Sequence, residues 1–462
     1  MGLKNVNYKD KYMLYRKIEK EISDYLQREG DKVLVVTGAR QIGKSFIIRH
    51  SANKYYKNVV EINLIEDAEG PRVFDSVKTT EDFYFALSAY TSQKLGDASD
   101  TLIFLDEIQE YPQLLTLLKF LREEGRYRYV ASGSLLGVTL KKSSSVPLGS
   151  IDIMNMYPLD FEEFLMANDF GKDAIDGLRK CFEERRSVPD GIHARVMDLY
   201  KRYLLVGGLP EAVNKFLETR DLNQVRAIQE TIMELYKIDA AKYDNKHSLK
   251  IGRLYNLIPS NMENKKKRVV FKDIENKLGK RSSDYEEEIE YLISSGIALS
   301  VSAISNPRFP LAETEHKALI KLYLNDPGLL TAMLYRSNPM PVLNTESGIN
   351  LGSVYETAVA CQLAANDNHL FYYDNRTRGE VDFLYDDFDS LSVVPLEVKS
   401  GKDYKRHVAV SRFVSNEEYG IKEGFVLSNS GVVEKLGKIT YVPVYFSLFF
   451  DNRLSSKGPV LI

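Results

Sequence analysis

An apolar run at residues 33–36 leads directly into a glycine-bounded loop, and this junction constrains the fold more than any other stretch of the chain. Residues 38–45 follow the spacing G-x-x-x-x-G-K-[ST], and an apolar helical pattern begins at Phe46. Glycines allow backbone N–H groups to turn inward around phosphate oxygens, and the N-terminus of the next helix adds partial positive charge. A strand, a glycine loop and a helix in this order therefore predict a phosphate-binding loop (P-loop).

The P-loop predicts a role for two of its side chains. Lys44 is expected to reach the β- and γ-phosphates of a nucleotide, and the Ser45 hydroxyl is expected to coordinate Mg²⁺. The residues expected to contact the nucleotide in this stretch are Gly38, Ala39, Arg40, Gln41, Ile42, Gly43, Lys44, Ser45 and Phe46.

A second apolar strand, residues 101–105, ends in Asp106 and Glu107. In P-loop NTPases an acid at the end of a neighbouring strand holds the Mg²⁺ shell, and this is the role expected of Asp106. Glu107 follows directly and is placed to polarise an attacking water. The alternative is a pair of solvated acids at a strand end, but the P-loop upstream favours the catalytic interpretation.

The overall fold class predicted for the chain is α/β. Three further regions follow the first part, residues 1–155. Strands and helices alternate through residues 1–155, which predicts a parallel sheet with helices on both faces. Residues 156–240 are predicted to form a helical lid, with a sharp turn at Gly207 and Gly208. Residues 241–324 contain three helical patterns and extended segments, which is typical of a winged helix.

Several stretches are expected to face solvent. Residues 170–190 are charged and are predicted to be a surface insertion, and the basic cluster 265–268 is predicted to be a solvated loop. The would-be recognition helix of the winged helix reads SSDYEEEIEYL, and its four glutamates oppose contact with phosphates.

A helix at residues 81–95 is predicted to have Phe85 among its apolar positions.

Composition excludes several classes of protein. The net charge of -3 provides no global basic field that would indicate nucleic acid, although a local basic face stays open. The two cysteines, Cys181 and Cys361, form no CxxC motif, which argues for a reducing compartment and against a disulfide scaffold or zinc site. No apolar run has membrane-spanning length, and the N-terminus lacks a signal-peptide pattern. We therefore expect a cytoplasmic protein without a membrane partner.

The last region, residues 325–462, carries acids in the pattern of a metal-dependent nuclease core. Asp382 lies in one predicted strand, and Glu397 and Lys399 lie in the next, on the same strand face. Asp382 and Glu397 could hold a Mg²⁺ ion, Lys399 could orient the nucleophile, and Glu356 from a helix would complete the shell. The alternative is a chance Glu-x-Lys, or a nuclease-like fold without activity.

Taken together, these motifs resemble the prokaryotic AAA+ family ATPases that carry a C-terminal domain of unknown function with a PD-(D/E)XK nuclease-like core. The resemblance covers nearly the whole chain. The stretches that carry it are TGARQIGKS (37–45), FLDEIQ (104–109), SGS (132–134), YPLDFEEFL (157–165), GGLPEAV (207–213), KLYLNDPGLL (321–330), YETAV (355–359) and GEVDFLYD through PLEVKSG (379–401).

The resemblance implies ATP and Mg²⁺ as cofactors and adds expectations about further residues. In AAA+ proteins a polar residue at the end of the strand at 127–134 senses the γ-phosphate, so Ser132 or Ser134 is the candidate, with a plain strand–loop transition as the alternative. Arg122, Arg126 or Arg128 could act as an arginine finger across a subunit interface, with solvated charge as the alternative. Because AAA+ sites often lie between protomers, the resemblance makes a homo-oligomer plausible.

Two functions remain open for such a chain, besides a third possibility, a slow NTPase whose active site needs a partner subunit. In the first, ATP hydrolysis is coupled to a nuclease-like domain that cuts DNA or another nucleic acid. In the second, the protein is an ATP-dependent regulatory switch that binds DNA or a protein partner without cleavage, and the acidic recognition helix favours the protein partner.

Overall fold

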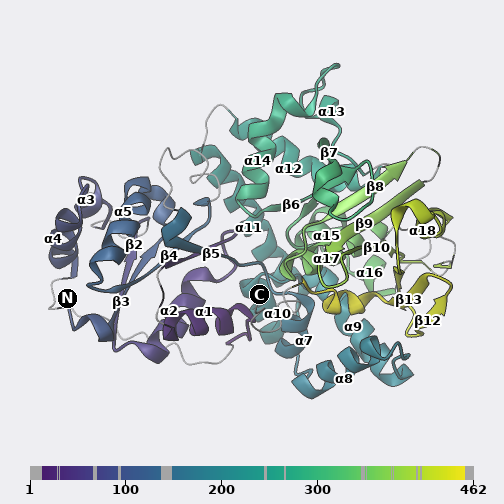
Figure 1. The fold of residues 1–462 in the computed structure, drawn as a ribbon, viewed down its shortest axis with the longest axis horizontal. Coiled ribbons are helices and arrows are strands. Elements are labelled where there is room, and N and C mark those ends of the chain that lie inside the picture. The colour runs from purple at the N-terminus through teal and green to yellow at the C-terminus, as the bar shows by residue number, and fades with distance from the viewer. Residues whose placement is uncertain are drawn as a thin grey trace.

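The computed structural model describes residues 13–452 except for 29, 31, 66–69, 92–94, 137–147, 244–246, 265–266, 345–348, 350, 376, 378, 402–403 and 406–407. Within these residues the chain forms two sheets joined by a helical region (Figure 1). The strands of the first sheet lie within residues 33–155, and those of the second lie within residues 298–443.

The first sheet is parallel and has the strand order β2-β3-β4-β1-β5. Its strands are β1 (Val33–Thr37), β2 (Asn58–Asn63), β3 (Thr101–Asp106), β4 (Arg128–Gly133) and β5 (Ile151–Asn155). The helices around it are α1 (Ile18–Gln27), α2 (Lys44–Tyr55), α3 (Gly70–Phe74), α4 (Thr80–Thr91) and α5 (Pro112–Glu124). The predicted parallel sheet is thus confirmed.

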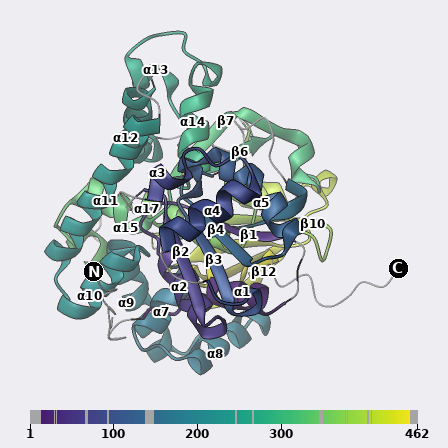
Figure 2. The ribbon, with the colours of Figure 1, turned by 90° about the vertical axis from the view of Figure 1, so that its left-hand side faces the viewer.

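Alternation along the strands explains why both faces of this sheet are covered. In β1, Leu34 and Val36 pack into the core that includes α1 and α2. Val33 and Val35 pack into a separate core with α4 and α5, so the helices lie on opposite faces (Figure 2). One apolar position was predicted wrongly, because Phe85 of α4 is 78% exposed.

The strand order determines where the predicted site residues meet. Because β1, β3 and β4 are parallel neighbours, their carboxyl ends lie at one edge of the sheet. The P-loop follows β1, Asp106 ends β3 and Ser132 lies near the end of β4. Ligands of open parallel sheets bind outside this edge.

A helical region connects the two sheets. Its helices are α7 (Phe161–Ala167), α8 (Lys172–Glu183), α9 (Asp190–Val206), α10 (Pro210–Thr219), α11 (Leu222–Tyr243) and α12 (Ser248–Glu263). The prediction that residues 170–190 form a surface insertion is wrong. Ile175, Leu178 and Cys181 of α8 are buried, and the Phe182 ring packs against Phe446 of the C-terminal part. The charges of α8 lie on its other face.

The second sheet has eight strands in the order β12-β13-β11-β10-β9-β8-β6-β7. These strands are β6 (Ala298–Ile304), β7 (Glu315–Leu324), β8 (Phe371–Asn375), β9 (Gly379–Asp387), β10 (Ser392–Val398), β11 (Gly424–Ser428), β12 (Glu434–Leu436) and β13 (Ile439–Pro443). The helices of this part are α13 (Phe271–Glu275), α14 (Glu286–Ser294), α15 (Pro327–Tyr335), α16 (Met340–Asn344), α17 (Gly352–Ala365) and α18 (Val408–Val414).

Strands β6 and β7 follow α12, α13 and α14, as a winged helix would require. However, β6 also pairs in parallel with β8, through Ser302 and Phe371 among other residues. The wing is therefore part of the C-terminal sheet, and the boundary predicted between residues 324 and 325 falls inside one continuous sheet.

Two glycine-containing motifs meet at the centre of the molecule. Asp326 caps α15 through the Leu329 N–H, and its other oxygen accepts a hydrogen bond of 2.6 Å from the Gly208 N–H. Gly207 has φ 75° and carries no Cβ, which would overlap the Asp326 carboxylate. Gly208 lies equally close to the backbone of Leu159. These glycines allow the turn between α9 and α10 to lie directly against the start of α15.

Candidate nucleotide site and acidic centre

The P-loop connects β1 to α2 and has the backbone that the glycine pattern predicts. Gly38 has φ 145° and Gly43 has φ 93°, conformations that L side chains rarely adopt. A Cβ at Gly38 would overlap the Met156 carbonyl oxygen, so a side chain does not fit there.

Lys44 is folded back over its own loop. Its Nζ donates to the carbonyl oxygens of Gly38 (3.0 Å) and Ala39 (2.8 Å), and the residue is only 5% exposed. Burial lowers the pKa of Lys44, and the charges of Glu107 and Asp106 oppose that shift. The ammonium is thus held beside the two acids that the sequence predicted to share the site.

Ser45, Asp106 and Ser132 form one hydrogen-bonded group. The Ser45 Oγ donates to Oδ2 of Asp106 at 2.6 Å, and the Ser132 hydroxyl donates to Oδ1. Burial raises the pKa of Asp106, although both hydroxyls counteract it. Hydroxyl and carboxylate oxygens are ligands that Mg²⁺ accepts, so Ser45 and Asp106 fit the predicted metal role.

Glu107 belongs to a second hydrogen-bonded group. Its Oε2 accepts from Gln109 Nε2 at 2.6 Å and from the Ser134 hydroxyl at 3.1 Å. Burial favours the neutral form of Glu107, but Lys44 and the Gln109 hydrogen bond outweigh it and lower its pKa. The two serines at the end of β4 therefore contact different acids. Gln109 was missed as a site residue, although it lies within the FLDEIQ stretch.

Arg40, in the middle of the P-loop, binds a helix far away in sequence. Its Nη1 forms an ion pair of 2.7 Å with Oδ1 of Asp239 on α11, and its Nε lies 3.4 Å from the Ser134 Oγ. The Tyr236 hydroxyl, also on α11, donates to the Arg40 carbonyl oxygen at 3.3 Å. The helical region thus contacts the P-loop directly, and no sequence motif marks Asp239 for this role.

The arginines proposed as fingers lie at the other end of the sheet. Arg128 begins β4, and its guanidinium stacks 4.4 Å from the Tyr25 ring centroid. Arg126 stacks 4.4 Å from the Tyr84 ring centroid. Within one chain neither reaches the P-loop edge, and the role of Arg122, Arg126 or Arg128 across a subunit interface stays a prediction.

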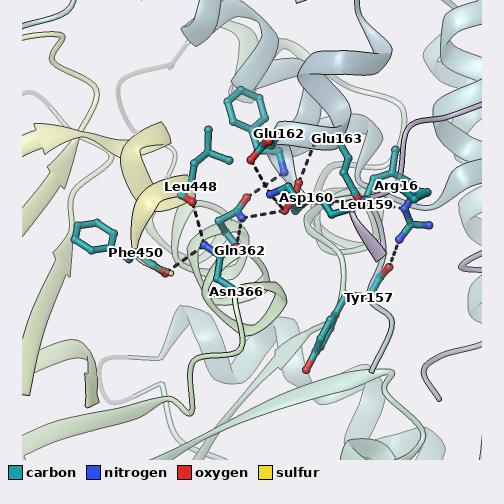
Figure 3. Close-up of polar contacts among 12 residues, drawn as sticks. Arg16, Tyr157, Leu159, Asp160, Glu162, Glu163, Gln362, Asn366, Leu448 and Phe450 are labelled. Carbon is teal, nitrogen blue, oxygen red and sulfur yellow. Dashed lines mark hydrogen bonds and ion pairs between the residues drawn. The ribbon is translucent and has the colours of Figure 1, made fainter. Parts of the chain in front are cut away.

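A buried polar network runs from Arg16, which contacts the P-loop, to the C-terminal part, and Figure 3 shows it from Arg16 to Phe450. Arg16 donates to the Ile42 carbonyl oxygen at 2.8 Å and to Glu163 of α7 at 3.2 Å. Glu163 and Asp160 form the capping box of α7. The network therefore reaches from the loop itself to the YPLDFEEFL stretch identified above.

The same network continues into α17. Gln362 Nε2 donates to Oδ2 of Asp160 at 3.3 Å and to Asn366 at 3.2 Å. Asn366 in turn donates to the carbonyl oxygens of Leu448 and Phe450 near the end of the described chain. The start of α7 and the C-terminal part of the chain, which are far apart in sequence, are thereby joined by hydrogen bonds.

The four acidic-centre residues predicted from the sequence do come together. Lys399 Nζ forms an ion pair of 2.6 Å with Oε1 of Glu397, and the Val398 N–H donates to Oδ2 of Asp382 at 2.9 Å. Burial and the neighbouring Asp382 raise the pKa of Glu397 to about 8 and that of Glu356 to about 7. Burial alone would raise the pKa of Asp382, but the surrounding lysines lower it.

Lys267 is the residue of this centre that the sequence did not predict. The basic cluster 265–268 was expected to be a solvated loop, and for Lys267 that expectation is wrong. Its Nζ forms an ion pair with Oε1 of Glu356 and lies 3.7 Å from Oδ1 of Asp382. Lys265 and Lys266 lie outside the described residues.

The acidic centre does not match a divalent-cation site. Within the described parts of the chain, no group of three or more His, Cys, Asp or Glu side chains is arranged to hold a metal ion. An ammonium group, from Lys267 or Lys399, faces each of the three carboxylates. The predicted coordination of Mg²⁺ by Asp382 and Glu397 therefore disagrees with this arrangement.

Comparisons with known families agree with the geometry of the P-loop. Residues 30–165 match the family model of an AAA domain. Residues 197–339 match a domain of unknown function (DUF8612), and residues 351–446 match a second domain of unknown function (DUF4143). No curated protein matches the chain.

Solved structures with some similarity include a Walker-type ATPase, paby2304, of Pyrococcus abyssi. It is 14% identical, with a TM-score of 0.41 over 70% of this chain and 96% of that one. The RuvB Holliday junction branch migration motor of Thermotoga maritima is 16% identical, with a TM-score of 0.29 over 64% and 90% of the two chains. C. elegans PCH-2 is 13% identical, with a TM-score of 0.29 over 44% and 62%. These scores are too low to carry an argument about this chain.

None of the helices in the described part of the chain is long and apolar enough to span a membrane.

The Walker-type loop, the paired acids of β3 and the matching family model agree with one another. The N-terminal part of this chain is therefore an AAA-type P-loop ATPase domain, and two domains of unknown function follow it.

Proposed function

We propose that the protein is an ATP-hydrolysing switch in which the nucleotide state of the P-loop controls the C-terminal part of the chain. The observation that carries this proposal is the ion pair between Arg40 of the P-loop and Asp239 of α11. A residue of the nucleotide-binding loop is thereby tied to the helical region, so a change in the loop acts on α11 directly. The buried network from Arg16 to Gln362 supplies a second physical connection (Figure 3).

The residues of the P-loop edge would share the chemistry as follows. Lys44 would bind the β- and γ-phosphates, and Ser45 and Asp106 would hold a Mg²⁺ ion that neutralises phosphate charge. Glu107, kept ionised by Lys44 and Gln109, would accept hydrogen bonding from the attacking water and orient it. Ser134 would sense the γ-phosphate. Its hydroxyl lies between Glu107 and Arg40, so a shift of Ser134 on nucleotide binding would change the hydrogen bonding of Glu107.

For the C-terminal part, the geometry favours binding of a partner without cleavage. Lys267 lies among the carboxylates that would otherwise hold a metal. Helix α14, the would-be recognition helix, exposes Glu286 and Glu287, which would repel the phosphates of DNA. These observations support a protein partner over a nucleic acid.

Metal-dependent cleavage of nucleic acid is the second candidate. It is favoured by one observation: among the described residues, Oε2 of Glu397 is buried without a hydrogen-bond partner. A buried carboxylate oxygen without a partner is a position that a ligand could satisfy. Lys399 forms an ion pair with Glu397, as the lysine of a nuclease-like centre would lie beside its acid.

One experiment separates the two candidates. Purified protein is incubated with Mg²⁺ or Mn²⁺, with and without ATP, on single- and double-stranded DNA and RNA. The switch predicts ATP hydrolysis that is lost in Lys44→Ala and no cleavage of any substrate. Cleavage that disappears in Asp382→Ala would instead establish the nuclease, and wild-type protein that hydrolyses no ATP would contradict the switch.

The ion pair between the P-loop and α11 gives a further prediction. Asp239→Asn releases the Arg40 guanidinium, which then becomes available to nucleotide phosphates. We expect the affinity for ATP to rise at least about fivefold, the lower end of usual coupling between sites. Titration with a fluorescent ATP analogue measures this change. Glu234→Gln, which removes an exposed partner of Lys237 on the same helix, is the matched control. An unchanged affinity in Asp239→Asn would contradict the coupling.

A further inference from the structure

Lys267 lies in the connection between α12 and α13 and reaches out of that region into the C-terminal sheet. Its backbone has φ 50°, a left-handed conformation that is uncommon for lysine. The next residue, Arg268, forms an ion pair of 2.6 Å with Asp374 of β8. The Val269 N–H donates to the Ile320 carbonyl oxygen of β7 at 3.2 Å. Three consecutive residues thus fasten this connection to the sheet.

The lysine head group is enclosed by acids from two elements. Side-chain exposure is 22% for Lys267, 3% for Glu356 of α17 and 9% for Asp382 of β9. The ammonium therefore compensates the carboxylates in a place that water reaches poorly.

The carboxylate oxygens of this centre are largely engaged. Glu356 contacts Lys267 through Oε1, and the Tyr323 hydroxyl donates to its Oε2 at 3.4 Å. Asp382 faces Lys267 through Oδ1 and accepts the Val398 N–H through Oδ2. Glu397 contacts Lys399 through Oε1, and its Oε2 is the one oxygen of the three carboxylates that has no partner among the described residues.

A divalent cation and the Lys267 ammonium compete for the same oxygens. Mg²⁺ requires oxygen ligands at about 2.0–2.1 Å in near-octahedral geometry, which the ammonium would obstruct. The two positive charges would also repel each other within a few ångströms in a poorly solvated site.

We propose that the Lys267 ammonium takes the cation position between Glu356 and Asp382, in the centre that they form with Glu397, so that Lys267 and a divalent cation exclude each other there. The centre then acts as an ion-pair clasp between the α12–α13 connection and the C-terminal sheet.

Binding of Mn²⁺ to the nucleotide-free, full-length protein tests the proposal. Free Mn²⁺ is measured by electron paramagnetic resonance during titration of the wild type, Lys267→Met, and Lys267→Met combined with Asp382→Asn. Lys267→Met is expected to bind one Mn²⁺ at least about tenfold more tightly than the wild type, because a facing positive charge no longer repels the cation. The second substitution is expected to abolish that binding.

Two outcomes would overturn the proposal. The first is wild-type protein that already binds Mn²⁺ in a manner that depends on Asp382. The second is a folded Lys267→Met variant that gains no Mn²⁺ site. Lys272→Met, on the exposed face of α13, is the matched control and is expected to bind as the wild type does.

Removal of Lys267 alone leaves buried carboxylates uncompensated and could prevent folding. The neutral pair Lys267→Met with Glu356→Gln removes one charge of each sign and keeps Asp382 and Glu397. We expect this variant to fold, as judged by circular dichroism, and to bind Mn²⁺ more tightly than the wild type. If it folds without doing so, the proposal fails.

Discussion

Glu107→Gln is expected to slow ATP hydrolysis by about 10²- to 10⁴-fold while ATP binding is retained, because the general base is removed but the P-loop is unchanged. The Glu107 carboxylate is held by Gln109 and Ser134 and lies beside Lys44, which keeps it ionised. Turnover with excess ATP and equilibrium binding of ATP are measured on the same preparation. Slow turnover with unchanged affinity would assign Glu107 to the chemical step.

The neighbouring Glu110 supplies the control for this experiment. Glu110 is exposed at the end of the short turn that follows β3, so Glu110→Gln is expected to hydrolyse ATP at the wild-type rate. Turnover of Glu107→Gln within about threefold of the wild type would remove Glu107 from the mechanism. Loss of ATP binding would show instead that the carboxylate supports the loop.

Gly208→Ala is expected to lower the free energy of unfolding by about 3 kcal/mol, the upper part of the usual range for an overpacked core position. A Cβ at this position would lie 2.7 Å from the backbone nitrogen of Leu159 and would overlap the Leu159 carbonyl oxygen. The backbone cannot move aside easily. Gly208 donates to Asp326 at 2.6 Å, and its oxygen accepts from the Leu159 N–H at 2.7 Å.

A second glycine separates this steric effect from the general effect of adding a methyl group. Gly177 lies inside α8, and nothing lies within 4 Å of a Cβ built there. Gly177→Ala is therefore expected to stabilise the protein by about 1 kcal/mol, since alanine is the better helix former. Urea denaturation of both variants and the wild type measures the two changes. If Gly208→Ala were as stable as Gly177→Ala, the close approach of Gly208 to Leu159 would be refuted.

The nucleotide edge could be predicted from the sequence because its residues lie at the ends of recognisable apolar strands. The spacing of the P-loop and the acids after residues 101–105 predicted Lys44, Ser45 and Asp106 at one site, and the structure places the Ser45 hydroxyl 2.6 Å from Asp106. Strand β5 was not predicted. It lies at the edge of the sheet, and its mixed burial gives no continuous apolar run.

Other parts of the site depend on contacts that no local pattern encodes. Asp239 approaches Arg40, and Lys267 approaches Asp382, across about 200 and 115 positions of the chain. An acid on a long helix and a lysine in a basic cluster each have an ordinary solvated interpretation. Only the packing of α11 and of the α12–α13 connection against other elements gives these two residues their partners.

Helix α8 shows how charge can conceal a packed element. Residues 170–190 are rich in charged side chains, which predicted a surface insertion. The apolar positions of α8 nevertheless recur at helical spacing, with Ile175, Leu178 and Cys181 buried. The helical spacing of these apolar positions indicates the buried face of α8, whereas the charged composition of the whole segment does not.

Hydrogen–deuterium exchange with and without ATP and Mg²⁺ tests the central claim most directly. If the P-loop controls the helical region, ATP is expected to change amide exchange in α11, near Asp239, as well as in the P-loop itself. Lys44→Ala is expected to abolish both changes. ATP-dependent changes confined to the P-loop and its sheet, with α11 unaffected, would contradict the switch.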